Sequence, residues 1–139
     1  MPIEDLARSD VVTADTDTPV AALATTMEDQ EVGSIVITDG DTPVGIVTDR
    51  DLTVRVLGAG IDSAGQTAAD VMTEDLCLID RGAGFYEAAD LMSEHGIRRL
   101  PVQDGDSLVG IITADDLTEL LADEQQKLAE VIRGQRPAY

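Results

Sequence analysis

The apolar positions of the chain follow the same order twice. In each half a short apolar run comes first, a segment with apolar residues at helical spacing follows, and two further apolar runs flank an Asp-Gly pair. Apolar runs around Asp-Gly are typical of a β-hairpin, and the helical spacing predicts an amphipathic helix. The expected segments are, in order, a strand over 11–14, a helix over 19–29, strands over 34–38 and 43–47, a helix after Thr48, a strand over 76–79, a helix over 84–95, strands over 99–103 and 108–112, and a helix after Thr113.

The two halves are copies of one sequence unit. Residues 39–53 and 104–118 are identical at ten of fifteen positions, at a constant offset of 65 residues. The same offset pairs Met27 with Met92. The duplication therefore covers nearly the whole chain and predicts two βαββα repeats.

The duplication also predicts the boundaries of the repeats. We expect a first repeat over 1–57, a flexible Gly-rich linker over 58–67, and a second repeat over 68–139. The final helix is expected to run to about Arg133, beyond its counterpart in the first repeat, and to expose an apolar stripe for a homodimer contact. Because a unit of about 65 residues buries too little surface to be stable alone, the two repeats should pack face to face.

The charge of the chain limits its partners. Asp and Glu number 28 against 9 Lys and Arg, which gives a net charge of −19. A field of this sign repels nucleic acid and anionic membranes, so we expect neither as a partner. A carboxylate-rich, Lys-poor surface suggests a halophilic protein, in which salt screens the self-repulsion. An acidic protein from an ordinary cytosol is the alternative.

Other features argue against several classes of function. No apolar stretch approaches the roughly 18 residues of a membrane span, and the first ten residues do not resemble a signal peptide, so we expect a cytoplasmic protein. Cys77 and His95 are each the only residue of their type, which argues against a metal site or a His-based catalytic triad. P-loop and GxGxxG motifs are absent. We expect a binding module and not an enzyme; a small enzyme using clustered carboxylates is the alternative.

Short motifs give the chain a family resemblance. Residues 44–52 (Val-Gly-Ile-Val-Thr-Asp-Arg-Asp-Leu) and 109–117 (Val-Gly-Ile-Ile-Thr-Ala-Asp-Asp-Leu) resemble the closing motif of the CBS domain, named after cystathionine β-synthase. Residues 99–102 and 70–73 look like two more of its recurrent segments. The resemblance spans about 5–122. It implies an α+β fold, in which two pseudo-twofold-related βαββα CBS repeats pack sheet to sheet.

The resemblance also implies a function. Many members of this family bind AMP, ADP or ATP in clefts between the repeats, and some bind NAD or S-adenosylmethionine. They act as regulatory sensors and not as catalysts. They commonly dimerise, and they require no cofactor. We therefore expect as partners an adenosyl small molecule, a second copy of the chain, and an effector protein that the sequence does not identify. A ligand-free protein-interaction module is the alternative.

Two Thr-x-x-Asp motifs are at the centre of the expected sites. Thr48 with Asp51, and Thr113 with Asp116, match family positions at which the carboxylate takes the ribose hydroxyls and the threonine lies near sugar or phosphate. A carboxylate can accept from two vicinal hydroxyls, and a helix start offers free N–H groups to a phosphate. The same spacing is that of a capping box, so a purely structural role, or both roles together, stays open.

Basic and apolar residues complete the expected sites. Arg98 and Arg99 resemble phosphate contacts of the family and Arg50 is a third candidate, although these arginines could instead pair with surface carboxylates. Their counterparts in the other repeat are Gly33, Ser34 and Asp115, so we expect the two clefts to differ. By family analogy, adenine is sandwiched between residues that precede the hairpins and residues of the first strands. Ordinary core packing would also explain these residues. They are Val32, Ile97, Val12, Thr13, Cys77 and Leu78.

Overall fold

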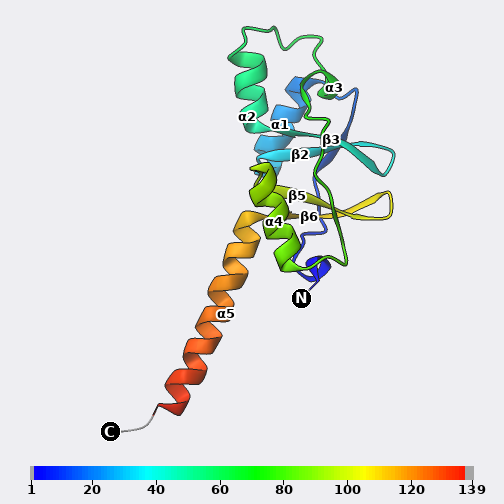
Figure 1. The fold of residues 1–139 in the computed structure, drawn as a ribbon. Coiled ribbons are helices and arrows are strands. Elements are labelled where there is room, and N and C mark those ends of the chain that lie inside the picture. The colour runs from blue at the N-terminus through cyan, green and yellow to red at the C-terminus, as the bar shows by residue number, and fades with distance from the viewer. Residues whose placement is uncertain (1, 137–139) are drawn as a thin grey trace.

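The computed structural model describes residues 2–136 and contains the repeat twice (Figure 1). The elements of the first repeat are η1 (Ile3–Asp5), β1 (Thr13–Asp15), α1 (Val20–Gln30), β2 (Ser34–Asp39), β3 (Thr42–Thr48), α2 (Asp49–Asp51) and the π-helical η2 (Leu52–Leu57). Those of the second are α3 (Ala68–Val71), β4 (Ile79–Asp80), α4 (Phe85–His95), β5 (Arg99–Asp104), β6 (Ser107–Thr113) and α5 (Ala114–Gln135). The predicted order of strands and helices is confirmed in both halves.

Each repeat folds its strands into a three-stranded sheet of the same topology. The orders are β1-β2-β3 and β4-β5-β6, with the first pair parallel and the hairpin antiparallel. Ile35 pairs with Val47 in the first hairpin, and Leu100 pairs with Ile112 at the equivalent place in the second. Because register decides which side chains face inward, the matched register places the same positions in both cores.

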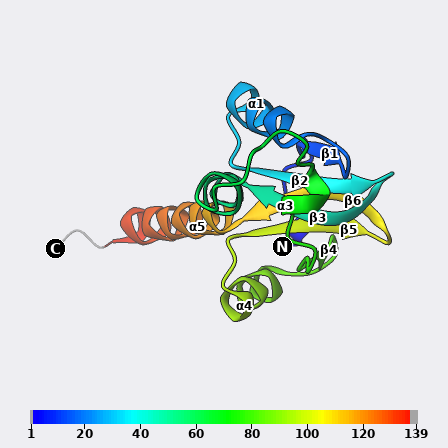
Figure 2. The ribbon, with the colours of Figure 1, turned by 90° about the horizontal axis from the view of Figure 1, so that it is seen from above.

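The two sheets lie between the amphipathic helices α1 and α4. Figure 2 shows α1 and α4 on opposite outer faces, with both sheets between them. Strands β3 and β6 contact each other where the sheets meet. This arrangement confirms the predicted α+β fold, with two repeats packed sheet to sheet.

Each hydrophobic core contains residues from the other repeat. Ile3, from η1, is fully buried in the core of the second repeat, while Ala68 and Val71, from α3, are buried in the core of the first. Backbone hydrogen bonds fix both exchanges, from Ile3 N to Ala83 O at 2.7 Å and from Ala68 N to Thr18 O at 2.9 Å. We call residues 2–8 and 67–73 the crossing segments. They make the two sequence repeats inseparable as packed units.

The crossing segments pass close to the sheets at two equivalent glycines. Arg8 and Ile111 exchange two backbone hydrogen bonds of 2.9 Å, and a Cβ on the neighbouring Gly110 would lie 2.9 Å from the carbonyl oxygen of Arg8. In the first repeat, a Cβ on Gly45 would lie 2.9 Å from the Cγ of Met72. At Gly110 the approach is to backbone and leaves no room for a side chain, whereas at Gly45 the Met72 side chain would have to move.

One detail differs from the sequence prediction. The first strands are shorter than expected, and Val12, Cys77 and Leu78 lie in extended chain before β1 and β4 and not within them. Each of these strands pairs with one neighbour only, β1 with β2 over three residues and β4 with β5 over two.

Helix α5 projects away from the body as a long rod (Figure 1). Among the described residues, no helix has the length and apolar character needed to cross a membrane.

Candidate functional site

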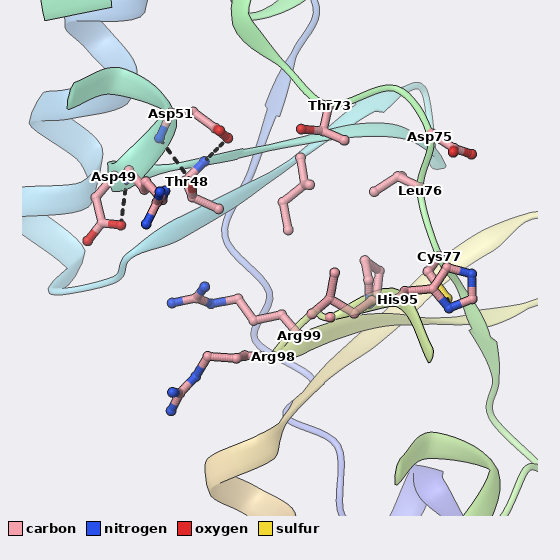
Figure 3. A pocket seen from close by; sticks show the side chains of 15 residues that line it. Thr48, Asp49, Asp51, Thr73, Asp75, Leu76, Cys77, His95, Arg98 and Arg99 are labelled. Atoms are coloured by element: carbon pink, nitrogen blue, oxygen red, sulfur yellow. Dashed lines mark hydrogen bonds between the residues drawn. The ribbon is translucent and has the colours of Figure 1, made fainter. Parts of the chain in front are cut away.

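A cavity of about 690 Å³ lies where the two repeats meet (Figure 3). The first repeat contributes the end of β3 and the start of α2, and the second contributes residues 73–77 and the turn from α4 into β5. The lining residues are Ile46, Thr48, Asp49, Arg50, Asp51, Thr73, Asp75, Leu76, Cys77, His95, Gly96, Ile97, Arg98, Arg99 and Pro101. Its size is within the range typical of small-molecule sites.

The Thr48–Asp51 motif is a capping box at the edge of this cavity. The Thr48 hydroxyl accepts a hydrogen bond from the Asp51 backbone N–H at 3.1 Å, and the Asp51 carboxylate accepts from the Thr48 N–H at 2.9 Å. The capping interpretation is therefore correct. It does not exhaust the carboxylate, because each oxygen has two lone pairs and only Oδ2 is used by the cap.

A third Thr-x-x-Asp pair shows what the motif does without a cavity. Thr67 and Asp70 form the same capping box at the start of α3, and neither lines the cavity. The motif at a helix start is therefore not by itself evidence of a ligand site. What distinguishes Thr48 and Asp51 is the cavity beside them.

Three arginines line the same cavity. Arg50 follows Thr48 at the start of α2, and Arg98 and Arg99 lie where α4 leads into β5. Figure 3 shows the side chains of Arg98 and Arg99 extending in the same direction. Arg98 Nη2 donates to Asp115 Oδ1 at 3.1 Å, but both side chains are more than 70% exposed, so this pair is weak.

Arg99 reaches across to the first repeat. A Cβ added to Gly33 would lie 3.3 Å from both Arg99 Nη2 and Asp49 Oδ2, so the guanidinium and the carboxylate flank this glycine. Gly33 is the counterpart of Arg98 in the duplicated sequence. Its lack of a side chain leaves room for the arginine of the other repeat.

Apolar side chains line another part of the cavity. Leu76, Cys77 and Ile97 are each partly buried, and the Cys77 Sγ lies 3.9 Å from His95 Nδ1. Burial raises the pKa of the Cys77 thiol, and the carboxylates of Asp75 and Glu94 raise it further. At neutral pH the thiol therefore stays protonated and adds no charge to this wall of the cavity.

The thiol gives a test of the cavity wall. We expect iodoacetamide to alkylate Cys77 in the folded protein more slowly than in the urea-unfolded chain at neutral pH, because the raised pKa lowers the thiolate fraction. The difference should shrink as the pH rises through the folded-state pKa. Alkylation rates measured by mass spectrometry across pH check this. Equal rates for folded and unfolded chain at neutral pH would contradict it.

The second Thr-x-x-Asp motif has the same cap but a different neighbour. Thr113 and Asp116 exchange hydrogen bonds of 3.0 and 3.2 Å, as in the first repeat. Arg8, from the first crossing segment, also donates to Asp116 Oδ1, at 3.1 Å from Nη2 and 3.4 Å from Nε. This hydrogen bond, together with the carboxylate charge, raises the pKa of Arg8.

The expected site residues thus divide between two places. The cavity brings together Thr48, Arg50, Asp51, Cys77, Ile97, Arg98 and Arg99. Lying outside its lining are Thr113, Asp116, Val12, Thr13, Val32 and Leu78. Residues that the sequence did not indicate include Asp49, Thr73, Asp75 and Arg8. The repeat offset could have found Arg8, because it pairs Arg8 with Thr73.

Comparisons with known proteins agree with this architecture. A family model described as the CBS domain matches residues 3–58 and 68–123. The uncharacterized protein MK0525 of Methanopyrus kandleri is 34% identical over 120 residues, which are 85% of this chain and 61% of that protein. The chain therefore spans less than two thirds of this relative. Hypoxic response protein 1 of Mycobacterium tuberculosis is 34% identical over 103 residues, 73% of this chain and 72% of that protein.

Solved structures share the fold. The CBS domain pair of protein MJ0100, in complex with 5′-methylthioadenosine and S-adenosyl-L-methionine, has a TM-score of 0.80 at 22% identity and covers 89% of this chain and 98% of that one. At that identity the likeness concerns the fold alone. Since the family model matches both repeats almost end to end, the chain belongs to the CBS domain family.

Proposed function

We propose that the chain is a regulatory module that binds an adenosyl ligand, either an adenine nucleotide or S-adenosylmethionine, in the cavity between its repeats. The observation that supports this most is the composition of one cavity. Apolar walls, three arginines and a carboxylate oxygen that the cap does not use line the same space, and Arg55 Nε lies 3.7 Å from that oxygen. This matches a ligand with a flat base, a sugar diol and an anionic group.

Each part of such a ligand has a partner in the proposal. Leu76 and Ile97 supply apolar surface for the adenine. Asp51 Oδ1 accepts from the ribose hydroxyls, since Oδ2 is held by the cap. Arg99 and Arg50 take the phosphate, for which the planar guanidinium provides paired donors. The adenosyl ligands of the MJ0100 pair support the same ligand class for this chain.

Binding has a route to regulation because both repeats build the cavity. A ligand that touches both repeats stabilises the arrangement it fits best and shifts the population toward it. Helix α5 is the element we propose for the output, through a homodimer or an effector protein. Its projecting part exposes Leu121, Leu128, Val131 and Ile132 by 55–64%. A cytoplasmic location and an adaptation to high salt stay predictions.

A ligand-free interaction module is the competing proposal. The ion pair between Arg98 and Asp115 favours it, because a structural partner already engages one of the three cavity arginines. The pair is exposed on both sides, so a phosphate could displace the carboxylate at small cost. We therefore keep nucleotide binding as the leading proposal.

Calorimetry with a panel of adenosyl ligands tests the proposal. AMP should bind to the wild-type protein, and Arg99→Gln should weaken AMP by about 10-fold, because one charge-assisted hydrogen bond is lost. Binding of 5′-methylthioadenosine, which has no phosphate, should change little. Arg133→Gln, on the projecting part of α5, is the matched control and should leave both affinities unchanged.

The result that would overturn the proposal is equally direct. If AMP, ATP, NAD, S-adenosylmethionine and 5′-methylthioadenosine all fail to bind the folded wild-type protein at high salt, the ligand-free module is the better explanation. If AMP binds and Arg99→Gln leaves it unchanged, the adenosyl ligand stands and the phosphate assignment fails.

A further inference from the structure

Arg8 lies against the carboxylate of the second Thr-x-x-Asp motif. Its guanidinium donates to Asp116 Oδ1 from Nη2 at 3.1 Å, while the Thr113 N–H occupies Oδ2 at 3.0 Å. Both oxygens of Asp116 are therefore engaged, and its side chain is only 11% exposed. A ribose hydroxyl would have to compete with Arg8 for the same oxygen.

The first repeat provides an internal comparison. The counterpart of Arg8 there is Thr73, at the same offset of 65 residues, and Thr73 lines the 690 Å³ cavity beside Asp51. The backbones are held alike: Arg8 exchanges two hydrogen bonds with Ile111, and Thr73 exchanges two with Ile46. Asp51 Oδ1 has Arg55 Nε at 3.7 Å, four residues further along the chain, whereas Asp116 Oδ1 is hydrogen-bonded at 3.1 Å by Arg8 from another segment.

The backbone of Arg8 also fixes where its side chain begins. The crossing segment is anchored by Ile3 in the second core and by the hydrogen bonds to Ile111. Arg8 is itself 63% exposed, so its guanidinium stays in contact with solvent while it covers Asp116. Because the Arg8 end of the pair is exposed while Asp116 is nearly buried, a point substitution at Arg8 removes the contact without disturbing the core.

Other charges near the second motif disfavour an anionic ligand. Asp115 stands where the first repeat has Arg50, and Gly33 and Ser34 stand where the second has Arg98 and Arg99. The three arginines of the proposed phosphate site therefore have no counterparts here. Besides Arg8, the basic side chain at this motif is Arg98, and Asp115 engages it at 3.1 Å.

We propose that Arg8 is the residue that restricts the chain to one adenosyl ligand, by covering Asp116 in the second cleft. This inference rests on the proposed function of the first cavity. It adds that the chain itself withholds the Asp116 carboxylate from a ligand, through one side chain.

The test compares ligand stoichiometry in the wild type and in Arg8→Thr, which gives the second cleft the residue of the first. The probe is 5′-methylthioadenosine, which carries no phosphate and so does not need the missing arginines. Calorimetry, continued well beyond saturation of the first site, should find one molecule per chain in the wild type and two in Arg8→Thr. Arg8→Lys keeps the positive charge and should still bind one.

Further variants locate the added site. In the Arg8→Thr background, Asp116→Ala should return the stoichiometry to one, and circular dichroism should show that each variant is folded. Two molecules bound to the wild type, or one bound to folded Arg8→Thr, would overturn the inference and leave the proposed function intact. If 5′-methylthioadenosine binds to neither protein, the inference is overturned, and the proposed function falls with it only if AMP, ATP, NAD and S-adenosylmethionine also fail to bind.

Discussion

Replacing Ile3 by alanine is expected to lower the free energy of unfolding by about 2–5 kcal/mol, the usual cost of truncating a fully buried isoleucine. Ile3 lies within the first few residues of the chain, where a substitution would ordinarily be harmless. Here its side chain is 0% exposed and packs in the core of the second repeat with Ile79 and Leu100. Truncation would leave a cavity that the surrounding sheet and helix cannot fill.

Urea denaturation followed by circular dichroism measures this loss. Ile61→Ala is the matched control, because the same side chain is removed from a position that is 46% exposed. It should change the free energy of unfolding by less than about 0.5 kcal/mol. An Ile3→Ala loss no larger than that of the control would show that the first crossing segment does not complete the second core.

Asp51→Asn is expected to weaken adenosyl-ligand binding by about 100-fold, because both hydrogen bonds from a ribose diol would lose a charged acceptor. Asparagine retains a side-chain oxygen for the Thr48 N–H, so the cap and the fold should persist. The substitution therefore separates the two roles of the residue. It removes the charge offered to the ligand and keeps the acceptor that starts α2.

Asp116→Asn is the matched control for this measurement. Asp116 makes the same cap with Thr113, but Arg8 donates a hydrogen bond to the carboxylate oxygen that the cap does not use. The affinity of the first ligand should stay unchanged in this variant, as measured by calorimetry. Equal losses in the two variants would mean that the effect comes from the caps and not from ligand contact. No loss in either would remove Asp51 from the proposed site.

The duplication made most of the fold predictable from the sequence. Ten identities in fifteen residues fix the hairpins, and Asp-Gly turns with Gly40 at φ 63° and Gly105 at φ 61° close both of them. The Thr-x-x-Asp spacing located the helix starts correctly. These features depend on residues close together in the chain, where periodicity and turn chemistry are informative.

Local sequence patterns could not predict which site residues come together in space. Arg99 belongs to the second repeat and faces the first, and Arg8 contacts a residue 108 positions away. Both pairings depend on how the crossing segments and sheets pack, which no local pattern records. The difference between the clefts was expected from Asp115 and Gly33, but the contact between Arg8 and Asp116 was not.

The exchange of Ile3 and of Ala68 with Val71 gives the chain the geometry of a segment-swapped dimer joined into one polypeptide. Each repeat donates its first helical turn to the other and receives the equivalent turn in return. In such an arrangement a lone repeat has both an unfilled core and an unplaced turn, and a second copy satisfies both at once. Because the exchange takes place within one polypeptide, the two turns need not be identical: position 8 is arginine where the equivalent position 73 is threonine.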